Sequence, residues 1–212
     1  MKKIYCISGL GADERVFQNL HVPGVNFEYI KWLVPRKGES IEDYATRMNA
    51  SVEGDHPVLM GVSFGGMMSI EMAKQKPVQK IIIISSVKSH EELPPWMKIT
   101  GKLHLNALIP ERSPQWFSQF ADFFLGAENE QEKILAKHFR NNVSSDYLHW
   151  AIDKVIKWQN TQQPGPIFHI HGTLDKTFPI RNIQPTHVIK NGGHFMVMNK
   201  ADEISAIIEG II

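Results

Sequence analysis

One hexapeptide, GVSFGG at residues 61–66, places a serine between two glycines in the pattern Gly-x-Ser-x-Gly. An apolar run precedes it at residues 56–60, and a helix-like stretch follows at residues 67–73. Between a strand and a helix, this pattern holds a serine on a sharp turn with its hydroxyl exposed. The flanking glycines are needed because such a turn brings backbone segments too close for a β-carbon and can force unusual dihedral angles. The pattern therefore predicts that Ser63 is a nucleophile.

A serine hydroxyl is a poor nucleophile at neutral pH, so it needs a base within hydrogen-bond reach and a third group that orients the base. Asp175, within residues 171–179 (HGTLDKTFP), follows a strand-like run, and His194, within residues 191–195 (NGGHF), follows the last such run. A lone aspartate or histidine in a loop is more often a cap or turn residue. Three suitable residues in the chain order Ser, Asp, His favour a catalytic triad of Ser63, Asp175 and His194.

Short apolar runs that alternate with helix-like segments must position these residues. Residues 81–84 (IIII) show no polar alternation, which is typical of a central parallel strand covered on both faces. Helices are expected from a capping serine at residue 40 to about residue 48, from residue 63 to about 76, and over residues 201–209. This alternation predicts an α/β fold, a three-layer α/β/α arrangement around a mostly parallel, roughly six-stranded sheet. The expected strands are residues 3–8, 27–33, 58–61, 80–85, 167–171 and 186–190.

The alternation stops between residues 87 and 163, where helical patterns dominate. Helices are expected from the Ser-Pro pair at residues 113–114 and over residues 130–140 and 146–158. We predict a helical insertion at residues 87–163, packed over the open end of the sheet, within a single domain of residues 1–212. Most of its aromatic side chains should form its own core, and a few should line a substrate cavity. They are Trp96, Trp116, Phe117, Phe120, Phe123, Phe124, Trp150 and Trp158.

Taken together, the motifs resemble the α/β-hydrolase fold superfamily. The matching pieces are residues 61–66, residues 171–175 with a proline at 179, residues 192–195 (GGHF), and residues 8–11 (SGLG) after the first strand. The resemblance covers essentially the whole chain and puts the helical insertion in the family's cap position.

The resemblance also implies a role for each site residue. Ser63 would attack a carbonyl carbon, His194 would take the serine proton and later protonate the leaving group, and Asp175 would orient the imidazole. The backbone N–H groups of Leu10 and Phe64 would hold the oxyanion, because Phe64 would begin a helix whose dipole favours negative charge.

The chain departs from the family pattern in three places. Ser8 and Gly9 stand where members often have His-Gly, and the chain starts at what resembles the family's third strand, which predicts a sheet shortened at one edge. Some relatives carry the acid after the preceding strand, where this chain reads SSV at residues 85–87. This absence favours Asp175 as the acid, with Glu91 and Glu92 as second choices.

Composition and charge narrow the class of protein. With 212 residues, 42% hydrophobic, the chain suits one soluble domain, and its net charge of +1 does not favour nucleic acid or an anionic membrane as a partner. The single cysteine, Cys6, cannot form an intrachain disulfide and is expected to be buried in a strand. The apolar start ends at Leu10 without a signal-peptide cleavage site, and no stretch has the length of a membrane span, so a cytoplasmic location is expected.

Other motifs fail on closer reading. A dinucleotide fingerprint beginning at Gly9 would need a glycine where Glu14 stands, and a phosphate loop beginning at Gly61 would need Lys-Ser/Thr at residues 67–68, which are Met-Met. His169 and His171 would face the same side of a strand, but no third ligand accompanies them, so hydrogen-bonded core histidines are the preferred interpretation. Neither a metal nor a cofactor is expected.

The function that follows is a serine hydrolase that cleaves a carboxylic ester or thioester through an acyl-enzyme. The aromatic insertion suggests an apolar substrate of small to medium size. Two alternatives remain open. The same residues can serve lyase or carbon–carbon bond chemistry in this fold, or the fold can be kept by a ligand-binding protein without turnover.

Overall fold

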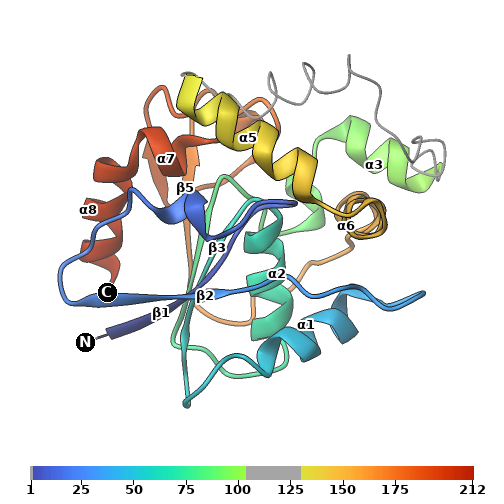
Figure 1. Ribbon diagram of the computed structural model, residues 1–212, viewed down its shortest axis with the longest axis horizontal. Coiled ribbons are helices and arrows are strands. Elements are labelled where there is room, and N and C mark those ends of the chain that lie inside the picture. Colours follow the sequence, from blue (N-terminus) through green and yellow to red (C-terminus); the bar gives the residue numbers. More distant parts are fainter. Residues whose placement is uncertain (1, 104–129) are drawn as a thin grey trace.

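The computed structural model describes residues 2–103 and 130–212. At its centre lies a six-stranded sheet with the order β2-β1-β3-β4-β5-β6, in which every neighbouring pair is parallel (Figure 1). All six predicted strands are present, but the strand expected at residues 27–33 lies at Val25–Ile30, and the one expected at 186–190 is shorter. Their bounds are β1 Lys2–Ile7, β2 Val25–Ile30, β3 Val58–Val62, β4 Lys80–Ile84, β5 Ile167–Gly172 and β6 His187–Ile189.

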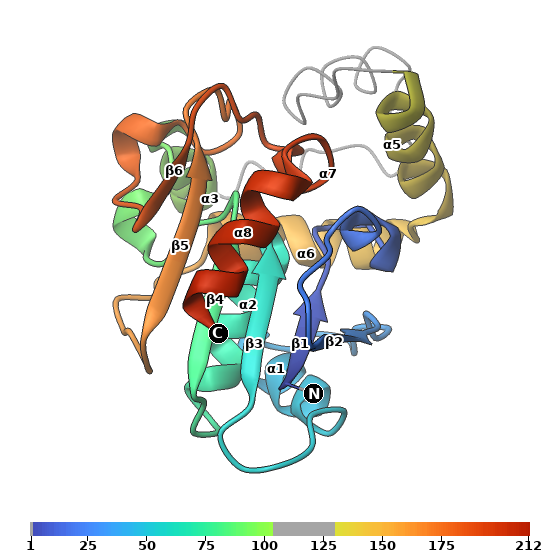
Figure 2. The ribbon, with the colours of Figure 1, turned by 90° about the vertical axis from the view of Figure 1, so that its left-hand side faces the viewer.

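Helices cover both faces of the sheet, which gives the predicted three-layer α/β/α fold (Figure 2). In β4, Ile81 and Ile83 pack in the core under α1 and α2, whereas Ile82 and Ile84 pack in the core under α7 and α8. All four side chains are fully buried, because a strand with both faces covered alternates between two apolar cores.

The predicted helix starts are found where the sequence places them. Ser40 caps α1, and its hydroxyl accepts the N–H of Asp43 at 3.0 Å. Helix α2 begins directly after Ser63, and all ten of its residues are buried between the sheet and its helical neighbours. The helices are η1 Glu14–Phe17, α1 Ile41–Asn49, α2 Phe64–Ala73, η2 His90–Glu92, α3 Pro95–Lys102, α5 Glu130–Asn142, α6 Ser145–Ile156, η4 Ile180–Asn182, α7 Met196–Asn199 and α8 Ala201–Ile211.

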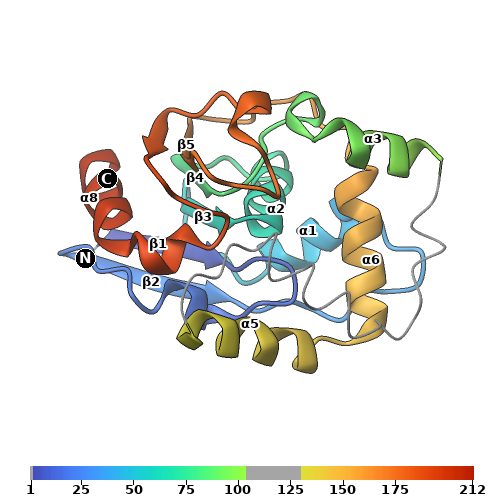
Figure 3. The same cartoon turned by 90° about the horizontal axis from the view of Figure 1, so that it is seen from above.

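The described parts of the predicted insertion are helical and contain no strand. Helices α3, α5 and α6 lie toward the end of the sheet where β1 and β3 finish (Figures 2 and 3). The expected helices at residues 130–140 and 146–158 correspond to α5 and α6, while the bounds 87–163 and the role as a cap stay predictions. The expected helix start at residues 113–114 and Trp116, Phe117, Phe120, Phe123 and Phe124 lie outside the described residues.

Two further expectations concern burial. Cys6 is buried in β1, and this burial raises the pKa of its thiol. Trp158 is buried and donates its indole N–H to Glu71 of α2 at 2.6 Å, so it packs in the core between the sheet and α2 and not in a separate core of the insertion. Within the part of the chain that is described, no helix combines the length and apolar character needed to cross a membrane.

Candidate active site

Ser63 lies at the turn between β3 and α2. Its backbone has φ 54° and ψ −120°, a strained conformation that persists only where the surroundings enforce it. A β-carbon on Gly65 would lie 2.2 Å from the carbonyl oxygen of Ile7, and one on Gly61 would lie 2.1 Å from the carbonyl oxygen of Gly65. Because only glycine fits at these positions, the turn holds the partly exposed Ser63 at the carboxyl edge of the sheet.

His194 links Ser63 to Asp175 by two hydrogen bonds. Its Nε2 lies 2.9 Å from Oγ of Ser63, and its Nδ1 lies 2.9 Å from Oδ2 of Asp175. A carboxylate can only accept, so Nδ1 carries the proton and the bare Nε2 accepts the serine hydroxyl. The structure thus brings the three predicted residues together in the tautomer that can take a proton from Ser63.

Two glycines bring the loops of Asp175 and His194 into contact. A β-carbon on Gly172 would lie 2.2 Å from the carbonyl oxygen of Gly192. The same carbonyl accepts the N–H of Leu174 at 2.8 Å. This close approach places the acid and the base within hydrogen-bond reach although they follow different strands.

The carboxylate of Asp175 is buried, and both of its oxygens accept hydrogen bonds. Its Oδ1 accepts the backbone N–H groups of Thr177 at 2.9 Å and of Phe178 at 2.8 Å, while Oδ2 faces His194. Burial alone would raise the pKa of Asp175, but the charge and hydrogen bond of His194 and the backbone N–H of Phe178 lower it below its ordinary value. Asp175 is therefore ionised at neutral pH and can stabilise a protonated His194.

Two backbone N–H groups, of Phe64 and Leu10, were predicted to bind an oxyanion beside Ser63. Phe64 is the first residue of α2, where an N–H has no intrahelical acceptor and the helix dipole is positive. The loop after β1 reaches the same point, since a β-carbon on Gly9 would lie 3.5 Å from Cβ of Ser63. Leu10 follows in this loop, and its part in an oxyanion hole stays a prediction.

Aromatic rings gather beside the turn, and we call Trp32, Phe64 and Trp150 the aromatic wall. Trp32 stacks on Phe64 with centroids 5.2 Å apart and planes at 9°, and Trp150 meets Phe64 edge-on at 6.1 Å. Trp32 also donates its indole N–H to the hydroxyl of Ser8 at 3.0 Å. Ser8 and Trp32 also line a cavity of about 230 Å³ together with Asp13, Phe17 and Tyr29, but neither Ser63 nor His194 lines it.

The sequence analysis named Trp150 but missed Trp32. The sequence placed Trp32 inside the expected strand 27–33, but β2 ends at Ile30, so Trp32 lies in the loop after β2, whose neighbour β1 leads into the loop that contains Ser8. The available signal was an aromatic residue near the carboxyl end of an expected strand, because the carboxyl ends of parallel strands form the ligand-binding edge of such sheets.

The strand histidines form a buried pair, as expected of core residues. Nε2 of His169 lies 3.2 Å from Nδ1 of His171. Glu92, a second choice for the acid, lies 4.0 Å from Nδ1 of His169, whereas it is Asp175 that hydrogen-bonds His194. Over residues 2–103 and 130–212, no group of three or more His, Cys, Asp or Glu side chains is arranged to hold a metal ion.

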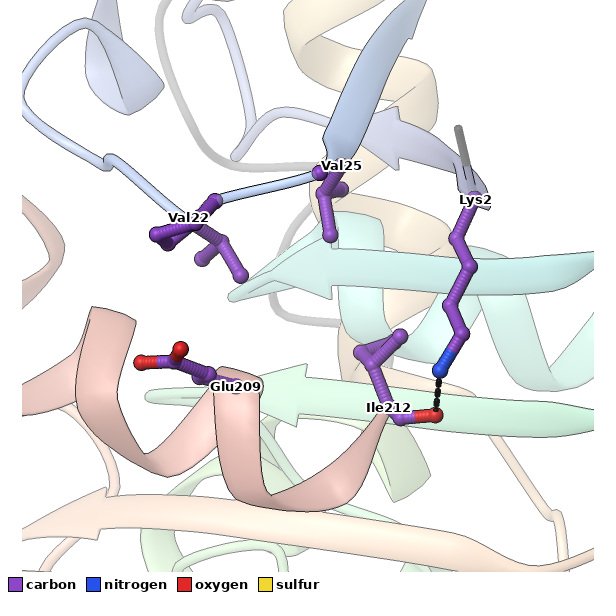
Figure 4. Close-up of a pocket in the computed structure, with 7 residues that line it drawn as sticks. Lys2, Val22, Val25, Glu209 and Ile212 are labelled. Atoms are coloured by element: carbon purple, nitrogen blue, oxygen red, sulfur yellow. Dashed lines mark hydrogen bonds between the residues drawn. The ribbon is translucent and has the colours of Figure 1, made fainter.

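A larger hollow, of about 660 Å³, lies at the opposite edge of the sheet, where β1 and β2 begin and α8 ends (Figure 4). At one side of it, the ammonium group of Lys2 donates a hydrogen bond to the backbone carbonyl of Ile212 (Figure 4). Parallel α/β sheets bind their ligands at the carboxyl ends of the strands. The hollow therefore lies at the wrong end of the sheet to serve Ser63.

The geometry around Ser63 fits the requirements of acyl transfer. The hydroxyl has a base in contact, the base has an ionised orienting group, and helix α2 presents its amino terminus to the place where negative charge would develop.

Comparison with known families agrees with this description. The model of the alpha/beta hydrolase family matches residues 23–207. Among curated proteins, no sequence matches the chain.

Solved structures similar to this chain share its fold at low sequence identity. A thermophilic esterase from Thermogutta terrifontis has a TM-score of 0.75 at 14% identity, covering 100% of this chain and 89% of the esterase. MenH from S. aureus has a TM-score of 0.76 at 17% identity, covering 99% and 92%. A lipase-esterase related protein from Clostridium acetobutylicum has a TM-score of 0.66 at 13% identity, covering 100% and 94%. At these identities the likeness establishes the fold alone.

Proposed function

The chain belongs to the alpha/beta hydrolase family, and from this premise we propose that it is a serine hydrolase acting on a carboxylic ester or thioester. The observation that carries the proposal is the hydrogen-bond chain from Ser63 through His194 to the buried carboxylate of Asp175. A protein that only binds a ligand has no need of a nucleophile, a base and an ionised acid in this arrangement.

The reaction proceeds in two halves. Oγ of Ser63 attacks the carbonyl carbon while Nε2 of His194 takes the hydroxyl proton, and the resulting imidazolium is stabilised by Asp175. The tetrahedral intermediate collapses when His194 returns that proton to the departing alcohol or thiol, which leaves an ester on Ser63. A water molecule then attacks this acyl-enzyme with His194 again as base, which releases the carboxylic acid and restores the serine.

The negative oxygen of both tetrahedral intermediates is held by the backbone N–H groups of Leu10 and Phe64. A single donor of this kind contributes about 2.7–4 kcal/mol to lowering the barrier. Because these donors belong to the backbone, the side chain of Leu10 should matter less than the path of the loop after β1.

The aromatic wall supports an apolar substrate. Trp32 and Trp150 are partly exposed, and both contact Phe64, the residue next to the nucleophile. If the acyl or alcohol part of a bound substrate extends from Ser63 toward these rings, it packs against them. This favours an apolar group of small to medium size.

The test is intact-protein mass spectrometry after treatment with a fluorophosphonate, which reacts only with an activated serine. Wild-type protein should gain one adduct and Ser63→Ala none. Ser85→Ala is the matched control, because Ser85 is buried at the end of β4 and should not affect labelling. An adduct on Ser63→Ala would place the nucleophile elsewhere, and no adduct on wild-type protein would contradict an activated Ser63.

A panel of p-nitrophenyl esters and acyl thioesters then identifies the reaction. Turnover that disappears in Ser63→Ala supports a hydrolase. A labelled Ser63 without turnover of either class would favour the non-hydrolytic chemistry considered from the sequence.

A further inference from the structure

Two buried histidines of β5, His171 and His169, lie next to Asp175 and its loop. His171 on β5 places its Nε2 2.8 Å from the carbonyl oxygen of Phe178 and 3.6 Å from Oδ2 of Asp175. The side chains of His171, Asp175 and His169 are all fully buried. The proposed mechanism gives the two strand histidines no role.

The surroundings of His171 determine which nitrogen carries its proton. Nε2 faces two oxygen acceptors, the carbonyl of Phe178 and the carboxylate of Asp175, so Nε2 must be the donor. Burial lowers the pKa of His171, which keeps the ring neutral and leaves Nδ1 bare. This bare nitrogen accepts the Nε2–H of His169 at 3.2 Å. Two sides thus fix one tautomer of His171: the oxygens of Phe178 and Asp175 require a donor at Nε2, and the N–H of His169 requires an acceptor at Nδ1.

Phe178 connects His171 to the proposed catalytic residues. Its backbone N–H binds Oδ1 of Asp175 at 2.8 Å, its carbonyl accepts from His171 at 2.8 Å, and its ring packs edge-on against His194 with centroids 5.6 Å apart. The side chain is almost fully buried. One residue thus contacts both the acid and the base, and His171 holds that residue in place.

We propose that His171 is a positioning residue: through Phe178 it fixes the Asp175 carboxylate and the ring of His194, while His169 holds His171 in its donor tautomer. The inference rests on the proposed function, since it assigns His171 a part in the activity of the same site. It requires no contact between His171 and the substrate, so it predicts an effect on acylation rate and not on substrate binding.

Two substitutions at His171 distinguish the effect of its N–H donor from the effect of filling the same space. His171→Phe keeps a ring but removes the donor, whereas His171→Gln places an amide N–H near the position of Nε2. The matched control is His187→Gln on the neighbouring strand β6, outside the site. The readouts are the fluorophosphonate acylation rate with its separate binding constant, and the deshielded proton NMR signal of the N–H between His194 and Asp175.

His171→Phe should acylate about 100-fold more slowly, because displacement of a catalytic group by about 1 Å costs that much. Its binding constant should stay close to the wild-type value, and the deshielded signal should shift or disappear. His171→Gln should recover most of the rate and the signal, and His187→Gln should behave as wild type. Wild-type acylation and an unchanged signal in His171→Phe, or an equal loss in the Phe and Gln variants, would overturn the proposal.

His169→Phe keeps the test decisive if His171→Phe does not fold. It leaves His171 in place but removes the donor to its Nδ1, so the rate should fall less than in His171→Phe and the histidine NMR spectrum should show a mixed tautomer. An unchanged rate and a single tautomer would overturn the role of His169. Absence of labelling in wild-type protein would contradict the proposed function alone, because the NMR signal between His194 and Asp175 reports positioning without turnover.

Discussion

Replacing the buried His169 by glutamine should reduce the loss of folding stability that the protein suffers when the pH is lowered. The side chain of His169 is fully buried, and this burial, together with His171 and the charge of Lys88, lowers its pKa from 6.5 to about 3. In the unfolded chain the same histidine takes up a proton near pH 6.5. Between these two values the unfolded state binds more protons than the folded state, so the free energy of unfolding must fall as the pH is lowered.

The size of the effect follows from the two pKa values. Proton uptake by the unfolded state alone lowers the free energy of unfolding by about 2 kcal/mol between pH 7.5 and pH 5. For a chain of this size, that loss corresponds to roughly 4–8 °C in melting temperature. Glutamine does not titrate, and its amide N–H can still reach Nδ1 of His171, so His169→Gln should lose about 2 kcal/mol less than wild type over this interval.

Urea unfolding at pH 7.5 and pH 5, followed by circular dichroism, measures the difference. Comparing the two pH values within each protein removes any constant cost of the substitution, and comparing wild type with His169→Gln removes other titrating groups, Asp175 among them. His21→Gln is the control, because His21 is exposed and its replacement also removes one imidazole. Equal acid sensitivity in wild type and His169→Gln would refute the reasoning that His169 is buried in its neutral form.

Three further predictions concern the site and the fold. Asp175→Asn should lower ester turnover about 10⁴-fold without loss of structure, because the amide oxygen would keep the two backbone donors and its NH₂ would face Nδ1 of His194, which leaves the proton on Nε2; near-normal turnover would assign the acid elsewhere. Gly65→Ala should abolish soluble expression or the cooperative melting transition, because the new β-carbon would meet the carbonyl of Ile7 at 2.2 Å, and a normal melting curve would contradict this packing. Ser40→Ala should cost about 1 kcal/mol by removing the cap on the Asp43 N–H, measured as a lower urea midpoint with an unchanged slope.

Local sequence patterns determined the central strand, the starts of two helices and the loops that hold the proposed triad. The apolar run at residues 81–84 has no polar face, so burial on both sides follows from the residues themselves. The capping serine at residue 40 binds the N–H of Asp43, and Gly61 lies against the backbone of Gly65, so the start of α1 and the elbow could be predicted from local pattern. The approach of Gly65 to the carbonyl of Ile7 depends instead on β1 lying beside β3. Asp175 and His194 were found because each lies in the loop after a strand, and parallel strands bring such loops to one edge of the sheet.

Only the tertiary structure decided the contacts that depend on the order and register of the strands. The contact of Phe64 with Trp32 requires β2 to lie beside β1 at one side of the sheet, a choice that no local pattern encodes. The row from Asp175 to His171 and His169 likewise depends on how the loop after β5 folds back until the carbonyl of Phe178 meets His171. Sequence alone showed two histidines on one face of a strand, and only packing determined that one of them would lie beside the acid of the proposed triad, because contacts between side chains arise from the whole arrangement of elements.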